Sequence, residues 1–165
     1  MRFSGLLYRA LNPVHAHVPL SGRGAKLYGG RFNPLGLPAI YTALSPTTAI
    51  RESNQVGTLQ PTTLAAFRAE IEAVFDIRDP ALMARQGLAP ADLARDDWRD
   101  RACAKTGAPT QALAIALLHN GFSGLLVRSF APGAGPDDLN LVLWQWNTRG
   151  ARLQVVDDEN RLGLT

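Results

Sequence analysis

Short apolar runs separated by Gly and Pro turns dominate the hydrophobic pattern of this chain, and they predict several short strands. The first three are expected at Gly5–Ala10, Leu27–Phe32 and Pro38–Leu44, where apolar and β-favouring residues lie between turn residues. Asn12–Lys26 contains two prolines and several small turn residues, so we expect a loop there.

A helix is expected directly after the third strand. Ser45 suits the N-cap and Pro46 the first helical position, because a serine oxygen can accept from the open N–H groups and proline has none to lose. Gly57 is expected to end this helix. Glu52 then lies in its second turn, close to the strand that carries Tyr41.

The middle of the chain fits two periodicities. Thr63–Ile77 has apolar residues at helical spacing, but Phe67, Ala69 and Ile71 also alternate as in a strand, and we favour the strand. The charged middle third is expected to form a peripheral layer. The remaining elements are expected to be helices at Asp79–Gly87, Pro90–Arg95 and Pro109–His119, buried strands at Gly124–Ser129 and Leu139–Trp146, and an edge strand at Arg152–Val156. This order indicates an α+β fold.

The composition indicates one globular domain over residues 1–165. Hydrophobic residues make up 46% of the chain, charged residues 19%, and the net charge is +3, which is too small and scattered to indicate nucleic-acid binding. A single cysteine, Cys103, excludes an intrachain disulfide and fits a reducing, cytoplasmic setting. The longest apolar run, Ala112–Leu118, is too short to cross a membrane.

The candidate chemistry lies in residues 29–34, which read Gly-Gly-Arg-Phe-Asn-Pro, and in Tyr41 and Glu52. The glycines would let the backbone approach a ligand, and the Arg31 guanidinium can hold a phosphate with paired hydrogen bonds. Tyr41 offers an aromatic face and Glu52 a carboxylate for a ribose. The same residues also fit a purely structural interpretation. The Gly-Gly and Asn-Pro pairs would then form ordinary turns, Arg31 would lie on the surface and Tyr41 would belong to the core.

Other motifs are weaker. Gly22-Arg23-Gly24 lacks the third glycine of a dinucleotide fingerprint, and His15 with His17 has no further close ligand, so we expect no metal site. Glu70 and Glu72 form a Glu-x-Glu pair of the kind that carries the catalytic acid in many ADP-ribosyltransferases, but a solvated strand face is the preferred interpretation.

Residues 29–34, then Ile-Tyr-Thr-Ala at 40–43, Glu52, Arg128-Ser129 and Asn-Leu-Val-Leu at 140–143 resemble, in this order, the RES-domain family. Its members are toxins of RES–Xre toxin–antitoxin pairs. The resemblance runs from Tyr8 to Gln145, and Phe32 stands where a Trp is common. It implies a single RES-type domain with a small split β-sheet core and peripheral helices, similar to ADP-ribosylating toxins.

The resemblance also implies site residues and a substrate. Catalytic roles fall on Glu52, Arg31 and Ser129, and cofactor binding on Arg31, Tyr41, Ser129, Asn140 and Tyr28. NAD+ is implied as the co-substrate, with no metal. Glu52 would bind the ribose 2′-hydroxyl and stabilise the oxocarbenium-like state as nicotinamide leaves. Ser129 would position the ribose or the amide.

The expected function is therefore a bacterial toxin that transfers ADP-ribose from NAD+ to a protein, with phosphoribosyl pyrophosphate synthetase as a candidate acceptor. Water or phosphate could attack the same ribose, which would make the protein an NAD+ glycohydrolase or phosphorylase. A silent nucleotide- or partner-binding module is the alternative from another class. The implied partner is an Xre-like antitoxin that occludes the active site; neither nucleic acid nor a membrane is expected as a direct partner.

Overall fold

The computed structural model describes residues 1–54, 58–103 and 107–163, and its centre is a mixed seven-stranded sheet. The strand order is β4-β5-β6-β2-β1-β3-β7. The strands are β1 (Phe3–Leu11), β2 (Ile40–Ala43), β3 (Thr63–Ile71), β4 (Val74–Asp76), β5 (Gly124–Arg128), β6 (Leu139–Leu143) and β7 (Ala151–Val155). The helices are η1 (Pro13–His15), α1 (Arg23–Tyr28), α2 (Pro46–Ser53), α3 (Pro80–Arg85), α4 (Pro90–Ala94), α5 (Trp98–Cys103) and α6 (Pro109–His119).

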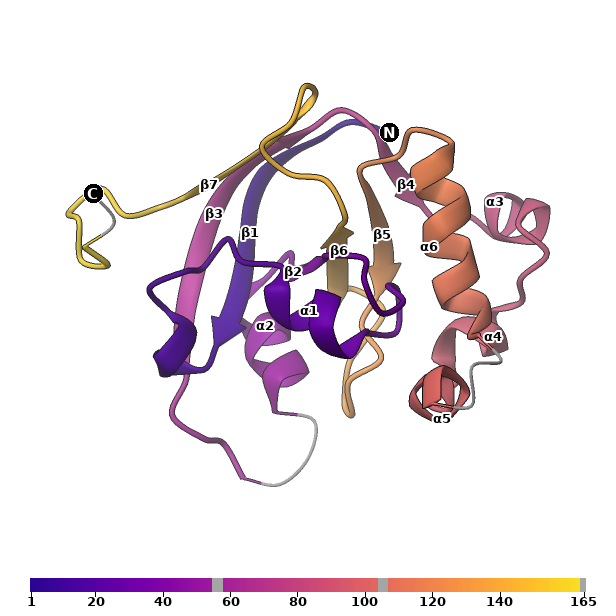
Figure 1. Ribbon diagram of the computed structural model, residues 1–165, viewed down its shortest axis with the longest axis horizontal. Helices are drawn as coiled ribbons and strands as arrows, with labels where there is room; N and C mark the ends of the chain where they lie inside the picture. Colours follow the sequence, from indigo (N-terminus) through magenta and orange to yellow (C-terminus); the bar gives the residue numbers. More distant parts are fainter. Residues whose placement is uncertain (55–57, 104–106, 164–165) are drawn as a thin grey trace.

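The sheet consists of two parts that meet at a narrow seam. The long half-sheet contains β1, β3 and β7, and the short half-sheet contains β4, β5, β6 and β2. Strands β1 and β3 pair along their whole length, whereas β1 and β2 share only the register pair Tyr8↔Ala43. Helices α3 to α6 gather beside the β4 and β5 edge, while α1 and α2 lie near the middle strands (Figure 1).

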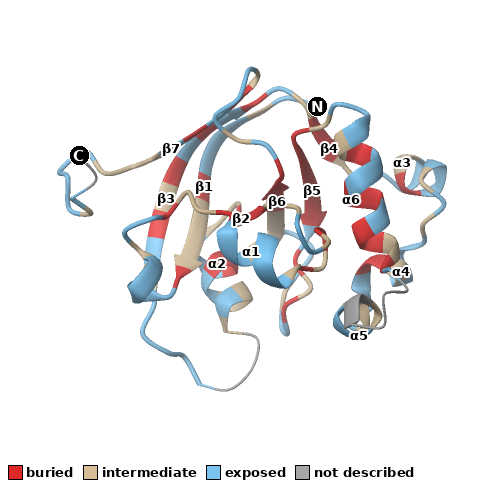
Figure 2. Cartoon of the chain, in the orientation of Figure 1, coloured by how far each residue is buried: buried red, intermediate tan, exposed pale blue. Residues whose placement is uncertain are grey.

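Two hydrophobic clusters, one on each face of the sheet, form the core of the protein. Neighbouring residues of β6 point to opposite faces, so Leu141 joins one cluster with Leu7 and Phe67, and Val142 joins the other. The second cluster packs the short half-sheet against α6 through residues such as Leu117. Figure 2 shows buried residues along both β5 and α6, and residues of both elements belong to this cluster. The first cluster takes buried residues from both half-sheets, such as Phe67 and Leu141, so it packs them together across the seam.

The sequence predicted most of these elements. Helices α2 and α6 begin at the expected prolines, Thr63–Ile77 holds β3 and β4, and β7 lies at an edge of the sheet. The predicted end of α2 at Gly57 falls outside the described residues.

Two predictions near the N-terminus were wrong. Leu27–Phe32 is not a strand: α1 runs to Tyr28, and Gly29 ends it with a φ of 69°, a conformation that glycine adopts without strain. The expected loop at Asn12–Lys26 contains η1 and the start of α1. Helix α5 was not expected. Within the described residues, no helix is long and apolar enough to span a bilayer.

Candidate active site

A cavity of about 630 Å³ opens at the seam between the half-sheets. It receives side chains or backbone from β1, β2, β5, β6 and α2, and from the segment that joins α4 to α5. Its volume is in the range of small-molecule sites, which is about 300–1,000 Å³. The predicted site residues that line it are Arg31, Tyr41, Glu52 and Asn140.

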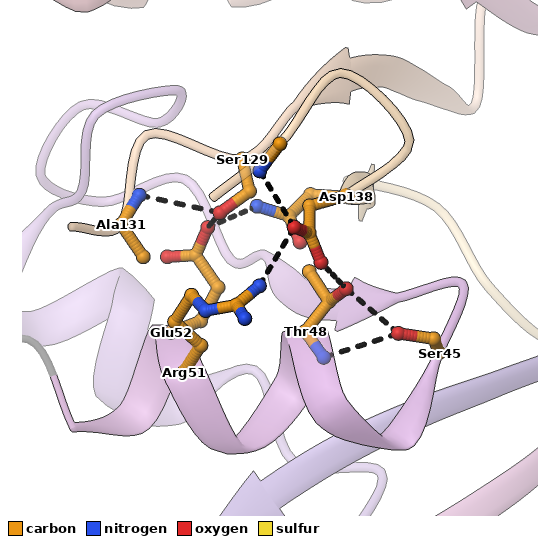
Figure 3. A network of polar contacts seen from close by, with 9 residues as sticks. Ser45, Thr48, Arg51, Glu52, Ser129, Ala131 and Asp138 are labelled. Carbon is orange, nitrogen blue, oxygen red and sulfur yellow. Dashed lines mark hydrogen bonds and ion pairs between the residues drawn. The ribbon is translucent and has the colours of Figure 1, made fainter. Parts of the chain in front are cut away.

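Glu52 reaches the cavity from the last turn of α2. The Ser45 side chain caps this helix by accepting from Thr48 N at 3.1 Å, and Pro46 follows as the first helical residue. The Oε1 atom of Glu52 accepts hydrogen bonds from Ser129 Oγ and from Asn140 Nδ2, both at 2.5 Å. Figure 3 shows the Glu52 carboxylate turned toward Ser129. Two neutral donors from the short half-sheet thus fix one oxygen of the carboxylate.

Ser129 and Asn140 differ in their access to the cavity. Ser129 is buried, also accepts from Ala131 N at 3.2 Å, and does not line the cavity. Its place behind Glu52 fits orientation of the carboxylate, not the direct contact with ribose or amide that we expected. Asn140 lines the cavity, and its Oδ1 is buried with no hydrogen-bond partner among the described residues. Because Nδ2 must face the carboxylate, this unpaired acceptor is fixed in orientation.

Tyr41 presents its ring to the cavity and uses its hydroxyl inside the protein. The hydroxyl donates to Asn33 Oδ1 at 2.7 Å and accepts from Phe32 N at 3.0 Å. Burial raises the pKa of Tyr41 above its usual range, so the phenol stays neutral. The buried Asn33 side chain in turn donates to Ala25 O at 2.8 Å and Leu37 O at 3.0 Å. Asn33 therefore joins Tyr41 to the 29–37 loop.

The glycine pair serves this packing. A Cβ on Gly30 would overlap the Tyr41 hydroxyl and Asn33 Oδ1, and the Gly30 carbonyl accepts from Gln111 Nε2 at 2.9 Å. The missing Cβ thus makes room for Tyr41. Gly30 also lines the cavity, so the expected approach of its backbone to a ligand stays a prediction.

Arg31 is held by the α4–α5 segment. Its Nη1 donates to Leu93 O at 3.0 Å and to Arg95 O at 2.5 Å, and its Nη2 pairs with Asp96 at 2.6 Å. The guanidinium also lies 4.9 Å from the centre of the Phe130 ring. The Arg31 side chain is 14% exposed, whereas that of Asp96 is 91% exposed. Arg31 thus fastens this segment to the rim of the cavity while still facing it.

The same segment carries two cavity residues that the sequence analysis missed. Trp98 and Arg99 both line the cavity, with the Arg99 guanidinium 4.7 Å from the centre of the Trp98 ring. The region was interpreted as a charged peripheral layer, and this hid them. A tryptophan among charged residues was the available signal, since such a ring suits the edge of a ligand site.

Tyr28 is not brought to the site. It ends α1 with 81% of its surface exposed and does not line the cavity. The resemblance implied Tyr28 as a cofactor-binding residue, and its position at the end of α1 does not support that role.

The Glu-x-Glu pair also lies apart from the cavity. Glu70 lines a second, shallow hollow of about 330 Å³ on the outer face of the long half-sheet, with Arg68 and Arg152. Glu72 is exposed beside Gly150, whose carbonyl accepts from Glu72 N at 2.8 Å. Across the described ranges, no three His, Cys, Asp or Glu side chains are close enough together to hold a metal ion.

Known proteins resemble this chain in sequence. Residues 6–165 match the RES domain. The chain belongs to the RES-domain family. The NAD(+) phosphorylase MbcT of Mycobacterium tuberculosis is 33% identical over 147 residues, which is 82% of this chain and 72% of MbcT. Toxin Res of Photorhabdus laumondii is 45% identical over 47 residues, or 28% of this chain and 30% of that protein.

A chain of one solved structure also shares the fold. The crystal structure of the M. tuberculosis MbcT–MbcA toxin–antitoxin complex superposes with a TM-score of 0.73 at 26% identity, covering 95% of this chain and 84% of the matched chain. The predicted RES-family membership and α+β fold are therefore confirmed. The predicted split in the sheet corresponds to the narrow seam.

Proposed function

We propose that this RES-domain protein is the toxin of a bacterial toxin–antitoxin pair and cleaves the nicotinamide–ribose bond of NAD+. The observation that carries the proposal is Glu52, held by Ser129 and Asn140 at the wall of a cavity that Tyr41 and Arg31 also line. The name of MbcT as an NAD(+) phosphorylase supports the substrate.

The chemistry needs a fixed negative charge and little else. As the glycosidic C–N bond breaks, its electron pair leaves with neutral nicotinamide and positive charge develops on the ribose. Glu52 stabilises this charge and accepts from the ribose 2′-hydroxyl, and its hydrogen bonds to Ser129 and Asn140 keep it in place. The Tyr41 ring packs beside the nicotinamide. Arg31 faces the phosphates, and a phosphate can displace the exposed Asp96 from it.

Orthophosphate is the acceptor that we favour. A phosphate oxygen attacks the ribose carbon as nicotinamide departs, which gives a 1-phosphate of ADP-ribose. The relative's name supports this acceptor, and it takes precedence here over transfer to a protein such as phosphoribosyl pyrophosphate synthetase. Water is the third acceptor open to the same mechanism.

One assay separates these outcomes. Purified protein is incubated with adenylate-labelled NAD+ in the absence of phosphate, with phosphate, or with a cell lysate. Phosphate-dependent nicotinamide release with a phosphorylated ADP-ribose product supports the proposal. Label in protein favours the transferase, phosphate-independent ADP-ribose favours the glycohydrolase, and no release of nicotinamide favours the silent binding module.

The proposed partner is an antitoxin that covers the cavity mouth, as the MbcT–MbcA toxin–antitoxin complex suggests. That the antitoxin is of the Xre type, and that the pair is cytoplasmic, remain predictions. Co-expression with the neighbouring gene should restore growth and give a stable complex that no longer releases nicotinamide. A complex that forms but still cleaves NAD+ contradicts occlusion.

A further inference from the structure

Asp138 forms a polar hub just before β6, outside the cavity. Its Oδ1 accepts from Thr48 Oγ1 at 2.5 Å, and its Oδ2 accepts from Arg51 Nη1 and from Gly135 N, each at 2.7 Å. Figure 3 shows this carboxylate between the β5–β6 loop and α2, with Thr48 and Arg51 reaching toward it. Asp138 does not line the cavity. Its side chain therefore ties one helix to one loop.

The main chain around Asp138 holds the other side of the site. The Asp138 carbonyl accepts from Ser129 N at 2.7 Å, and the next carbonyl, of Leu139, accepts from Leu44 N at 2.9 Å. Asn140 follows two residues later in β6. One short stretch thus fixes both donors to Glu52, Ser129 through its backbone and Asn140 through the strand.

The helical spacing connects this hub to Glu52. Thr48 and Glu52 are four residues apart on α2, so they lie on the same face one turn apart. Arg51, which pairs with Asp138, directly precedes Glu52. Asp138 therefore holds α2 at the turn that carries Glu52, from the same backbone that carries Ser129 and Asn140.

We propose that Asp138 is the positioning residue that sets the distance between Glu52 and its two donors. This inference depends on the proposed function, because it assigns Asp138 an effect on NAD+ cleavage. Asp138 touches no reacting atom and acts only through Thr48, Arg51 and Gly135. Since a misplacement of about 1 Å can reduce a rate by about 100-fold, removal of the carboxylate should affect the chemical step more than NAD+ binding.

The test compares five variants with the wild type in the nicotinamide-release assay. Asp138→Ala removes the hub. Asp138→Asn can keep all three contacts, because the asparagine oxygen can accept from Arg51 and Gly135 while the side-chain amide donates to the Thr48 hydroxyl. Asp137→Ala is the matched control, since Asp137 is an exposed neighbour with no side-chain partner in the described part of the chain. If Asp138→Ala does not fold, Thr48→Val removes one arm of the hub at similar volume, and Thr48→Ser restores the hydroxyl.

We expect Asp138→Ala to lower kcat by about 10- to 100-fold and to change the KM for NAD+ by less than about threefold. Asp138→Asn and Asp137→Ala should stay within about threefold of the wild-type kcat. The kcat of Thr48→Val should be well below that of Thr48→Ser.

Three results overturn the inference: wild-type kcat in Asp138→Ala, equal losses in Asp138→Asn and Asp138→Ala, or equal activity in the two Thr48 variants. A wild-type protein that releases no nicotinamide overturns the proposed function, and the positioning role with it. An active wild type with an equally active Asp138→Ala overturns only the positioning role.

Discussion

Glu52→Gln is the sharpest test of the catalytic mechanism, because it removes the charge and can leave the local structure intact. Ser129 and Asn140 both donate to Oε1 of this side chain, and a glutamine oxygen can accept both hydrogen bonds. Glu52→Ala is a poorer probe, since it leaves two donors without their acceptor, at a cost of about 1–3 kcal/mol for each group left buried and unpaired.

The expected loss follows from the role of the charge. A missing electrostatic contact to a transition state typically lowers the rate by about 10²–10³, which corresponds to a barrier higher by about 3–4 kcal/mol. We expect this loss in single-turnover nicotinamide release, with a thermal unfolding midpoint close to that of the wild type. Toxicity on expression should disappear with the activity.

Glu70→Gln and Glu72→Gln are the matched controls. Neither side chain lines the cavity, so both variants should cleave NAD+ at the wild-type rate. Near-wild-type turnover in Glu52→Gln, together with a loss in Glu72→Gln, would refute the reasoning and assign the catalytic acid to the Glu-x-Glu pair.

Three further predictions concern the residues around Glu52. Arg31→Lys keeps the charge but has one nitrogen where the guanidinium uses both Nη1 and Nη2 to reach Leu93, Arg95 and Asp96. We therefore expect a raised KM for NAD+ in steady-state kinetics; an unchanged KM would exclude Arg31 from binding. Tyr41→Phe leaves Asn33 Oδ1 without its donor, and urea unfolding should show a stability loss of about 1–3 kcal/mol, whereas equal stability would show that the bond is dispensable. Hydrogen bonds from Thr48 and Gly135, together with the charge of Arg51, hold the pKa of Asp138 below its usual range. The ionised Asp138 carboxylate therefore stabilises the fold fully above the unfolded-state pKa of about 3.9. This stabilisation is lost as the pH falls through the lower pKa of the folded state. The stability difference between wild type and Asp138→Asn should therefore be present at neutral pH and vanish in strong acid; a constant difference would contradict this linkage.

Local signals in the sequence predicted the elements that carry Glu52 and its two donors. The Ser45-Pro46 cap and the apolar strand before it fixed the start of α2 and so the position of Glu52. Apolar runs also predicted β5, which Ser129 directly follows, and β6, near whose start Asn140 lies. These features depend on neighbouring residues, and pattern rules describe such short-range preferences well.

Long-range pairing was beyond these rules. The attachment of Arg31 to the backbone of Leu93 and Arg95 joins segments that are distant along the chain, and no periodicity marks it. No sequence pattern marks Asp138 either. In the sequence it is one acidic loop residue among several, and only the folded structure brings Thr48 and Arg51 of α2 to it. Tyr28 illustrates the reverse error: the resemblance implied it as a binding residue, but it ends α1 on the surface and does not line the cavity.

The narrow seam at Tyr8 and Ala43 has a consequence for how the protein melts. Strands β1 and β2 share a single register pair there, while each half-sheet has its own extensive ladder. The cavity is lined from both sides of this junction, by Tyr8 and Ala10 on one and Tyr41 and Asn140 on the other. The two half-sheets share one hydrophobic cluster but only this one register pair. A nucleotide bound in the cavity as proposed would contact both of them, and saturation with it should raise hydrogen-exchange protection on both sides of the junction.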